Sequence, residues 1–193
     1  MIRIARESDI PAMLEVYGPY VLESTYTFEY TVPSREEFTA RFREITAQFP
    51  WLVWEEDGRV LGYAYGSAPF TRAAYAWCGE VSIYLSPRIH GRGIGRQLYA
   101  LLEDIMWKQG YRVIYSLITT ENEGSLAFHE KLGYKTGCVM EKCGVKFGRE
   151  LGVVWMEKRA EIVDIPTISP CPWTCIVEND GNLKNILANL SLS

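Results

Sequence analysis

Three closely spaced glycines form the turn in this sequence that is best suited to hold an anion. Gly91, Gly93 and Gly95 follow a strand-like run at 82–85 and precede a segment with helical periodicity. Glycine adopts left-handed backbone angles and leaves nearby backbone N–H groups unobstructed, and the N-terminus of a helix favours negative charge. Arginine side chains around the turn can donate charge-assisted hydrogen bonds to phosphate oxygens. The turn is therefore predicted to bind a pyrophosphate, together with Arg88, Arg92 and Arg96.

The spacing of this turn does not fit two common nucleotide-binding loops. A dinucleotide-binding turn needs the pattern G-x-G-x-x-G, and Arg96 stands where its third glycine would be. A P-loop needs Lys-Ser or Lys-Thr after its last glycine, and Gly95 is followed by Arg96 and Gln97. The remaining alternative is a glycine-rich connector without a ligand. The neighbouring arginines favour an anion site over that alternative.

The cysteines are a second group that could do chemistry, as metal ligands or in disulfides. Their number is odd, and their spacing lacks the regularity of a secreted disulfide scaffold. A zinc site made from the pairs 138/143 and 171/175 would lack both a tight C-x2-C spacing and supporting histidines. We therefore expect no metal, and reduced thiols at Cys78, Cys138, Cys143, Cys171 and Cys175.

The composition is that of an ordinary globular protein. The chain has 193 residues, of which 48% are hydrophobic, enough for one core. A net charge of −4 argues against a nucleic-acid partner, which would call for a basic surface. Residues 1–14 carry charges at short intervals and contain no apolar stretch long enough for a signal peptide or a membrane span. We expect a cytoplasmic protein with no membrane partner.

The elements that must position these groups alternate between strand and helix patterns. Ser8 and Asp9 can cap a first helix, Ser34 caps a second, and Asp57-Gly58 marks a hairpin turn. Periodicity then separates helices, which repeat near 3.6 residues, from strands rich in β-branched and aromatic residues. The first half is expected to contain a strand at 2–5, helices at 10–23 and 34–48, and three antiparallel strands at 51–55, 59–65 and 75–85.

The second half continues the alternation and ends in a segment of different character. We expect helices at 96–109 and 123–132, and strands at 113–118, 134–141 and 151–157. These elements form one domain, 1–158. Residues 159–193 contain three prolines within a short stretch and are predicted to be a tail outside that domain. Its end is expected to form an amphipathic helix that docks on the domain or on a second subunit, through Leu183, Ile186, Leu187 and Leu190.

The glycine turn and the element order together resemble the GNAT superfamily of acyltransferases. The segment from His90 to Gly95 is similar to its acyl-CoA pyrophosphate loop, usually Q/R-x-x-G-x-G/A, with His90 in the Gln/Arg position. The predicted order β-α-α-β-β-β-α-β-α-β-β also matches that fold. The resemblance implies an α/β (α+β) fold, with a mixed, mostly antiparallel sheet flanked by helices.

Further segments narrow the resemblance to the phosphinothricin and methionine sulfoximine acetyltransferases, over roughly residues 1–158. Two departures concern the acceptor side: Cys78-Gly79 replaces the usual Thr-Val before Glu80, and the loop 70–73 is slightly shorter than in the family. The similar segments are ESTYTFE (23–29), FPWLV (49–53), AYAW (74–77) ahead of Glu80, FHEKLGY (128–134) and GVKFGR (144–149).

The resemblance implies acetyl-CoA-dependent N-acetylation of a small amino acid or amino-acid analogue, by direct attack of the amine. Such a transfer needs the ammonium deprotonated and the departing thiolate protonated. Glu80 corresponds to the family's general base and His129 to the proton donor, since an imidazole ordinarily titrates near neutrality. Asn122 corresponds to the asparagine that binds the pantetheine arm. Direct attack gives Cys78 no nucleophilic role.

Each of these side chains also has a purely structural interpretation. Glu80 could be a surface carboxylate that ends a strand, His129 a packed helix residue, and Asn122 a simple helix N-cap. The resemblance adds backbone groups that would pair with the pantetheine amides. Besides Asn122, the predicted cofactor-binding residues are Ile83, Tyr84, Leu85, Arg88, Gly91, Arg92, Gly93, Ile94, Gly95 and Arg96.

On the acceptor side, the resemblance predicts a pocket for a compact zwitterion and a homodimer. Arg72 could bind the acceptor's carboxylate. Two other functions stay open: N-acetylation of a peptide or protein N-terminus, and acyl-CoA binding without catalysis. The predicted substrate-binding residues are Ser24, Thr25, Phe28, Arg72, Tyr75 and Trp77.

Overall fold

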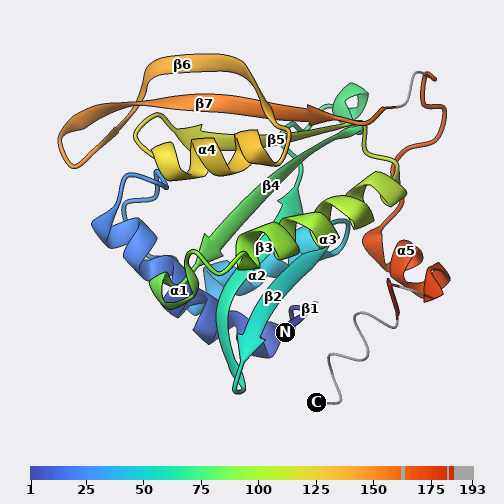
Figure 1. Cartoon of the computed structure of the whole chain (residues 1–193), viewed down its shortest axis with the longest axis horizontal. Coiled ribbons are helices and arrows are strands. Elements are labelled where there is room, and N and C mark those ends of the chain that lie inside the picture. The colour runs from blue at the N-terminus through green and yellow to red at the C-terminus, as the bar shows by residue number, and fades with distance from the viewer. Residues whose placement is uncertain (162–163, 182, 185–193) are drawn as a thin grey trace.

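The computed structural model describes residues 1–161, 164–181 and 183–184, which form one seven-stranded sheet with helices packed on it (Figure 1). The strand order is β1-β2-β3-β4-β5-β7-β6. Within the described chain, β4 and β5 run parallel and all other neighbouring strands are antiparallel. The strands are β1 (Ile2–Ile4), β2 (Trp51–Glu56), β3 (Arg59–Ser67), β4 (Cys78–Leu85), β5 (Val113–Thr119), β6 (Lys135–Lys146) and β7 (Arg149–Arg159).

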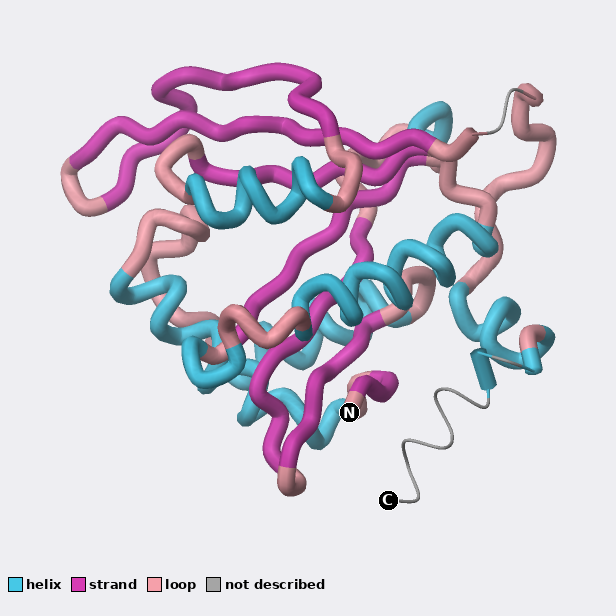
Figure 2. Tube along the Cα trace, viewed as in Figure 1, coloured by secondary structure: helices cyan, strands magenta, loops and turns pink. Residues whose placement is uncertain are grey.

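The helices follow the predicted order, and Figure 2 shows how they alternate with the strands along the chain. Helix α2 begins with a capping box in which Ser34 and Glu37 satisfy each other's backbone N–H groups. Three short 3-10 turns, at 7–9, 73–75 and 87–89, connect longer elements. The helices are α1 (Ile10–Glu23), α2 (Arg35–Thr46), α3 (Ile94–Gln109), α4 (Glu123–Lys131) and α5 (Trp173–Asn179).

The predicted α+β class and element order are confirmed, and three of the boundaries that differ have clear local reasons. The strand expected from residue 75 begins at Cys78, because residues 73–75 form a 3-10 turn. Helix α3 begins at Ile94, because Gly93 has a left-handed backbone and acts as its N-cap. Strand β6 continues to Lys146, because bulges near residues 137 and 141–143 let it stay paired with β7.

Two hydrophobic clusters lie on opposite faces of the sheet. One cluster packs α3, including Leu102, against alternate residues of β4 and β5, among them Val81 and Ile114. The other joins α1 and α2 to β2 and β3 and includes Phe38 and Trp51. Since side chains alternate between faces along a strand, Glu80 projects to the face opposite Val81, away from α3.

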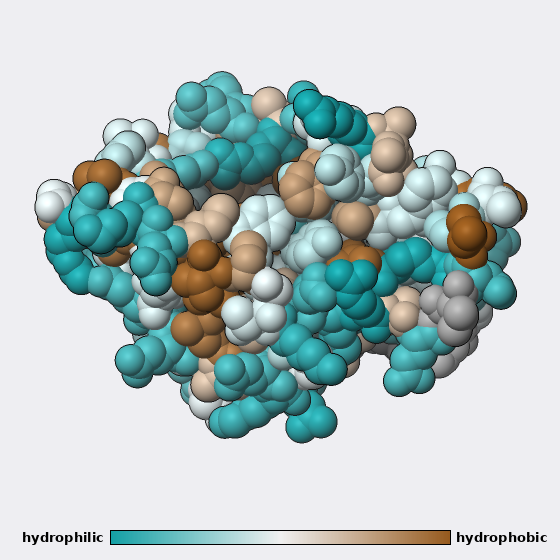
Figure 3. All heavy atoms as spheres, turned by 90° about the horizontal axis from the view of Figure 1, so that it is seen from above, coloured by the Kyte–Doolittle hydropathy of each residue, from teal (hydrophilic) through white to brown (hydrophobic). Residues whose placement is uncertain are grey.

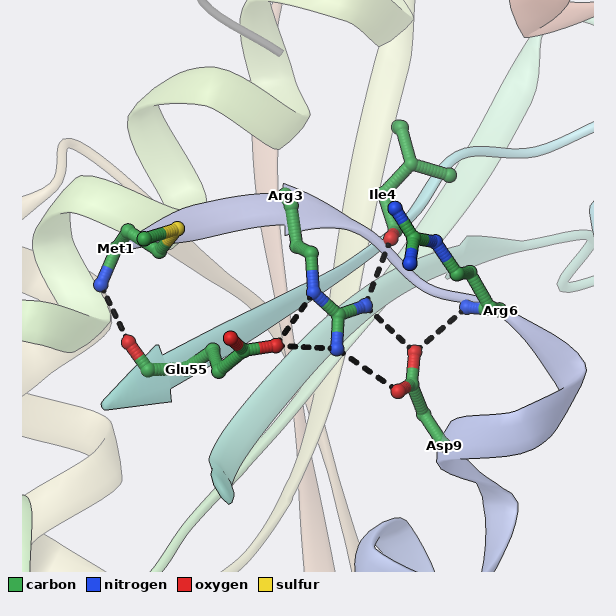
Figure 4. Close-up of polar contacts among 6 residues, drawn as sticks. All are labelled: Met1, Arg3, Ile4, Arg6, Asp9 and Glu55. Carbon is green, nitrogen blue, oxygen red and sulfur yellow. Dashed lines mark hydrogen bonds and ion pairs between the residues drawn. The ribbon is translucent and has the colours of Figure 1, made fainter. Parts of the chain in front are cut away.

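The N-terminus is fixed to the sheet by a buried ion cluster (Figure 4). The guanidinium of Arg3 donates two hydrogen bonds to Asp9, at 2.6 and 2.8 Å, and one to Glu55 at 2.7 Å. Asp9 also accepts from the backbone N–H of Arg6, and the Met1 ammonium donates to the carbonyl of Glu55. These charge-assisted bonds hold β1 against β2 at the edge of the sheet.

The described part of the tail packs against the C-terminal end of α3. The Gln109 amide donates to the backbone carbonyl of Cys171 at 2.7 Å, and the Trp173 indole donates to the carbonyl of Thr46 at 2.8 Å. Helix α5 lies beside α3 (Figure 1). Leu183 is buried. The other three leucine and isoleucine positions of the helix predicted for the end of the tail lie outside the described residues.

Candidate active site

The site is a gap in the sheet where β4 and β5 separate. The two strands pair through three residues each, ending at Glu80 opposite Tyr115. Beyond that point residues 81–84 and 116–118 line a pocket of about 60 Å³ that is also lined by residues of α3 and α4. Parallel strands that lose their pairing expose backbone N–H and C=O groups, which need other partners. The gap therefore leaves backbone groups of the two strands available to hydrogen-bond a ligand.

The glycine turn forms the wide mouth of this gap. Gly91 and Gly93 have φ of 72° and 74°, and no heavy atom lies within 4 Å of the position that a Cβ would occupy. Gly93 caps α3, so the free N–H groups of the helix's first turn open toward a cleft of about 630 Å³. A backbone that turns through left-handed angles beside a helix N-terminus fits a pyrophosphate.

Most of the predicted cofactor-binding residues line this cleft. Two of the three predicted arginines do not: Arg92 forms an ion pair with Glu56 at 2.6 Å, and Arg88 lies in the 3-10 turn before the loop. Arg92 is therefore held at the β2–β3 hairpin, and its position beside the glycines could not reveal that partner. The predicted residues that line the cleft are Ile83, Leu85, Gly91, Gly93, Ile94, Gly95, Arg96 and Asn122.

The hydrogen bonds of the β4 backbone determine which of its residues are free to pair with the pantetheine arm. The Tyr20 hydroxyl donates to the carbonyl of Leu85 at 2.7 Å and accepts from its N–H at 3.2 Å. Backbone groups alternate in direction along a strand, so those of Ile83 point to the same side as those of Leu85. Those of Tyr84 point toward β3. Of the three predicted residues, Ile83 thus offers backbone groups to the gap, while those of Leu85 are bonded to Tyr20.

Glu80 is the last residue of β4 that pairs with β5, at the point where the two strands begin to separate. Burial raises the pKa of its carboxyl from 4.5 to about 7. Among the described residues, no ion pair with its carboxylate offsets that cost. A carboxyl with a pKa near 7 is partly ionised and partly protonated at neutral pH, which suits a general base.

His129 on α4 is almost fully enclosed, with 1% of its surface exposed. Burial lowers the pKa of the imidazole to about 4, so the ring is neutral at pH 7. Its Nδ1 lies 2.8 Å from the carbonyl of Ser125, and its Nε2 lies 2.9 Å from the Tyr99 hydroxyl. The expectation that this imidazole titrates near neutrality is wrong, because apolar surroundings disfavour its charged form.

Asn122 joins a structural function to its place in the site. Its side-chain oxygen accepts from the N–H of Ser125 at 3.1 Å and caps α4, while the residue lines both the gap and the cleft. The structural interpretation of Asn122 as an N-cap is therefore confirmed.

Three of the predicted substrate residues lie where the connection after α1 meets the β6–β7 hairpin. Thr25 donates to Glu121 at 3.1 Å, and Ser24 donates to the carbonyl of Tyr20 at 2.8 Å. The ring of Phe28 packs directly on Gly144, where an added Cβ would approach it to 2.3 Å. The hairpin and this connection thus form one wall beside the gap.

The other three predicted substrate residues lie on the loop between β3 and β4. Tyr75 packs against Phe70, which stacks on Trp155 of β7 at 5.7 Å. The Trp77 indole donates to the carbonyl of Ile168 at 3.1 Å, so it is bound to the tail. Arg72 is exposed at the start of the 3-10 turn. Among the described residues, no hydrogen bond, ion pair or aromatic ring contact joins these three residues to Ser24, Thr25 and Phe28.

Several residues of the site were not predicted from the sequence. Tyr20 lines the cleft from α1, and nothing in its local pattern distinguishes it from other helix aromatics. Phe128 precedes His129 in a segment already noted for its resemblance. Tyr99, Ser116 and Ser125 line the gap with His129, and each lies at a position that periodicity assigns to the core or to a helix turn.

The cysteines and the charged clusters show no metal chemistry in the part of the chain that the structure describes. All five cysteines are free, and burial raises the pKa of Cys78, which keeps this thiol protonated at neutral pH. No group of three or more His, Cys, Asp or Glu side chains among the described residues could hold a metal ion. None of the described helices is long and apolar enough to span a membrane.

Known proteins share this fold and much of this sequence. A family model described as an acetyltransferase (GNAT) domain matches residues 2–155. The chain is 35% identical over 162 residues to phosphinothricin N-acetyltransferase of Alcaligenes faecalis, covering 81% of each. It is 31% identical to L-methionine sulfoximine/L-methionine sulfone acetyltransferase of Salmonella typhimurium, covering 81% of this chain and 92% of that protein.

A solved structure gives the same relationship in three dimensions. The phosphinothricin acetyltransferase of Sinorhizobium meliloti, crystallised with AcCoA, superposes with a TM-score of 0.79 at 37% identity. The match covers 82% of this chain and 87% of that one.

Proposed function

The chain belongs to the GNAT acetyltransferase family, and we propose that it transfers the acetyl group of acetyl-CoA to the amino group of a small amino acid or amino-acid analogue. The acceptor would be of the phosphinothricin or methionine sulfoximine type, as the activities for which its relatives are named indicate. The observation that carries the proposal is the carboxyl of Glu80, whose pKa of about 7 coincides with the end of β4–β5 pairing.

The glycine turn and the gap have the features that acetyl-CoA requires. Gly91, Gly93 and the first turn of α3 would hold its pyrophosphate, and the free backbone of Ile83 would hold its pantetheine arm. Acetyl-CoA supplies the acetyl group as a thioester, which an amine can attack directly. The chain's own contribution is to bind this group in the gap and to present it to the amine.

Glu80 is proposed to take the proton from the acceptor's ammonium group, directly or through water. A base is most effective when its pKa is near the working pH, and positioned acid–base groups contribute about 10²–10⁴-fold in rate. Glu80 reaches that pKa because its carboxyl is buried. It also lies on the face of the sheet that carries Tyr115 and Trp155, where the connection after α1 and the β6–β7 hairpin form a wall.

His129 is proposed to act in the same gap, but as a neutral ring. Its Nδ1 proton is directed to the Ser125 carbonyl, so the ring has no free proton for a thiolate. The departing CoA thiolate instead takes the proton that the attacking nitrogen loses when the amide forms. His129 contributes by ordering the polar groups at the floor of the gap. Cys78 keeps its thiol proton and has no part in the transfer.

The protein is also proposed to be a cytoplasmic homodimer. Five free cysteines are typical of a reducing compartment.

The proposed dimer would form at strand β6, which lies at the edge of the sheet. Val139 and Val145 of this strand and Phe147, just after it, are each about half exposed. The face of the molecule seen from above shows hydrophobic clusters among hydrophilic residues (Figure 3). Long apolar edge strands tend to pair with another chain. Light scattering across a concentration series measures the mass that decides this point.

The first experiment measures CoA thiol release from acetyl-CoA with a panel of amines. The panel holds free amino acids, phosphinothricin, methionine sulfoximine, methionine sulfone and short peptides. Glu80→Gln keeps the shape of the side chain and removes the base, so its turnover should fall by about 10²–10⁴-fold. Glu44→Gln, an exposed carboxylate on α2, is the matched control and should retain the wild-type rate.

Each other outcome points to a different function. Release with peptides alone would move the acceptor to a peptide or protein N-terminus. Binding of acetyl-CoA by calorimetry without turnover on any amine would favour an acyl-CoA-binding protein. Full activity in Glu80→Gln would remove the base assignment while leaving the transfer reaction in place.

A further inference from the structure

The buried pair formed by Tyr99 and His129 lies in the gap and has geometry that fixes the protons of both side chains. Tyr99 comes from the second turn of α3 and has 1% of its surface exposed, and the two rings meet edge to face at 5.2 Å. Both residues line the pocket between the separated strands. A buried phenol needs a hydrogen-bond partner, and here that partner is the imidazole.

The direction of each hydrogen bond follows from what surrounds the imidazole. The carbonyl of Ser125 can only accept, so Nδ1, at 2.8 Å from it, must carry the hydrogen. In a neutral imidazole the other nitrogen is then an acceptor. Nε2 lies 2.9 Å from the Tyr99 hydroxyl, so Tyr99 donates.

The charged groups nearby leave the ring neutral. Tyr134 of the α4–β6 connection packs edge to face on His129, but its hydroxyl donates to Glu103 at 2.7 Å. The Glu103 carboxylate also accepts from Lys158 at 2.6 Å, which balances its charge. On the other side of the ring lies the apolar edge of Phe128. No carboxylate among the described residues contacts the imidazole to hold it as a cation.

We infer that Tyr99 is a positioning residue of the active site, which holds His129 as the neutral Nδ1–H tautomer by donating its phenol hydrogen to Nε2. The inference rests on the proposed function for its kinetic part and on geometry for the tautomer. Ser116 of β5 lines the same pocket as the two side chains. The hydrogen bonds from Tyr99 to His129 and from His129 to the Ser125 carbonyl therefore link α3 to α4 at the floor of the gap.

The tautomer can be read directly, because the protein has two histidines. Nitrogen-15 NMR of histidine-labelled protein separates protonated from unprotonated ring nitrogens, and a His90→Gln variant assigns the exposed ring of His90. The wild-type His129 signal should show a protonated Nδ1 and an unprotonated Nε2 at every pH from 5.5 to 8. A protonated Nε2 in the wild-type spectrum would overturn the inference without any variant.

The variant Tyr99→Phe keeps the ring packing and removes the hydroxyl. It should shift the Nε2 resonance and lower kcat by about 2- to 10-fold, the amount that corresponds to one hydrogen bond, with KM for acetyl-CoA within about twofold of wild type. Tyr111→Phe removes a buried hydroxyl that accepts from Gln48, and it should change neither readout.

The outcomes separate this inference from the proposed function. An unchanged His129 spectrum in Tyr99→Phe would overturn the positioning role. A shifted spectrum with unchanged kcat would overturn its part in catalysis. If no amine is acetylated by the wild type, the proposed function fails, and the NMR result still decides whether Tyr99 fixes the tautomer.

Discussion

The two ends of the β4–β5 pair differ in structure: one is closed by strand pairing and the other is open. At one end three paired residues on each strand close the sheet, and nearby the tail is bound through Trp77, Gln109 and Trp173. At the other end pairing stops, and the backbone faces a gap and a cleft of about 630 Å³. Glu80 lies at the boundary. Burial of its carboxyl there raises the pKa to about 7.

The same burial acts on two titratable groups of the site with opposite signs. It raises the pKa of the Glu80 carboxyl to about 7 and lowers that of the His129 imidazole to about 4. In each case the neutral form is favoured, because a charge loses more solvation than a neutral group does. Of these two groups, only Glu80 titrates near pH 7. Burial therefore explains both why Glu80 can act as a base and why the His129 ring is neutral.

The largest expected effect is on the pH dependence of activity. Below the pKa of Glu80, about 7, the ionised fraction falls tenfold for each pH unit. The value of kcat/KM should therefore fall roughly 50-fold from pH 7 to pH 5 and level off above about pH 8. A profile with a midpoint near pH 4.5 would mean that the open end leaves Glu80 in bulk water.

The next effect is a gain of stability when the base is removed. Because the folded pKa of Glu80 is raised, the folded protein binds more protons than the unfolded chain between pH 4.5 and 7, and ionisation of Glu80 lowers stability as pH rises through that range. Glu80→Gln should gain about 1–3 kcal/mol over wild type at pH 8 and little at pH 5. Urea unfolding at the two pH values measures the difference. An equal change at both would show that ionisation is not its cause.

At the closed end, Gly79→Ala should cost stability and leave cofactor affinity unchanged. An added Cβ would approach the terminal methyl of Met106 to 2.4 Å, in the core between β4 and α3. Overpacking of this kind costs about 1–3 kcal/mol, and the flexible Met side chain places this site at the lower end of that range. The double variant Gly79→Ala/Met106→Leu should recover part of the loss in urea unfolding. A tenfold loss of acetyl-CoA affinity would contradict the separation of the two ends.

At the open end, Gly93→Ala should weaken acetyl-CoA binding. Alanine at a φ of 74° is strained by about 1–2 kcal/mol, and relief of that strain would move the N–H groups of the turn. Calorimetry should show a Kd raised roughly 3- to 10-fold. Gly58→Ala is the matched control, since Gly58 has a φ of 72° and equally open surroundings in the β2–β3 hairpin. If both variants bind alike, backbone geometry at Gly93 is not what holds the ligand.

The smallest effect is expected from loosening the tail. Trp173→Phe removes the hydrogen bond to the Thr46 carbonyl and should lower the free energy of unfolding by about 1 kcal/mol. Limited proteolysis should then cut the segment 160–180 sooner than in the wild type. Trp54→Phe removes a hydrogen bond to Glu56 in β2 and should leave the tail's cleavage rate unchanged.

Much of the fold and part of the site could be predicted from local sequence. Hydrophobic periodicity indicated the order of helices and strands, and three glycines ahead of an amphipathic segment indicated the anion-binding turn. These signals are short-ranged, because capping, turn geometry and amphipathic spacing act over a few residues. The same reasoning could not find α5, whose seven residues lack a strong pattern and are stabilised by contact with α3.

The sequence by itself determined the class of fold and the glycine turn that precedes α3. Tertiary structure alone decided which partners the charged and polar groups took. Tyr99 meets His129 from 30 residues away, Arg92 meets Glu56 across 36, and Trp77 meets Ile168 across 91. Such pairs depend on how elements pack, and burial at those contacts then sets which groups carry charge.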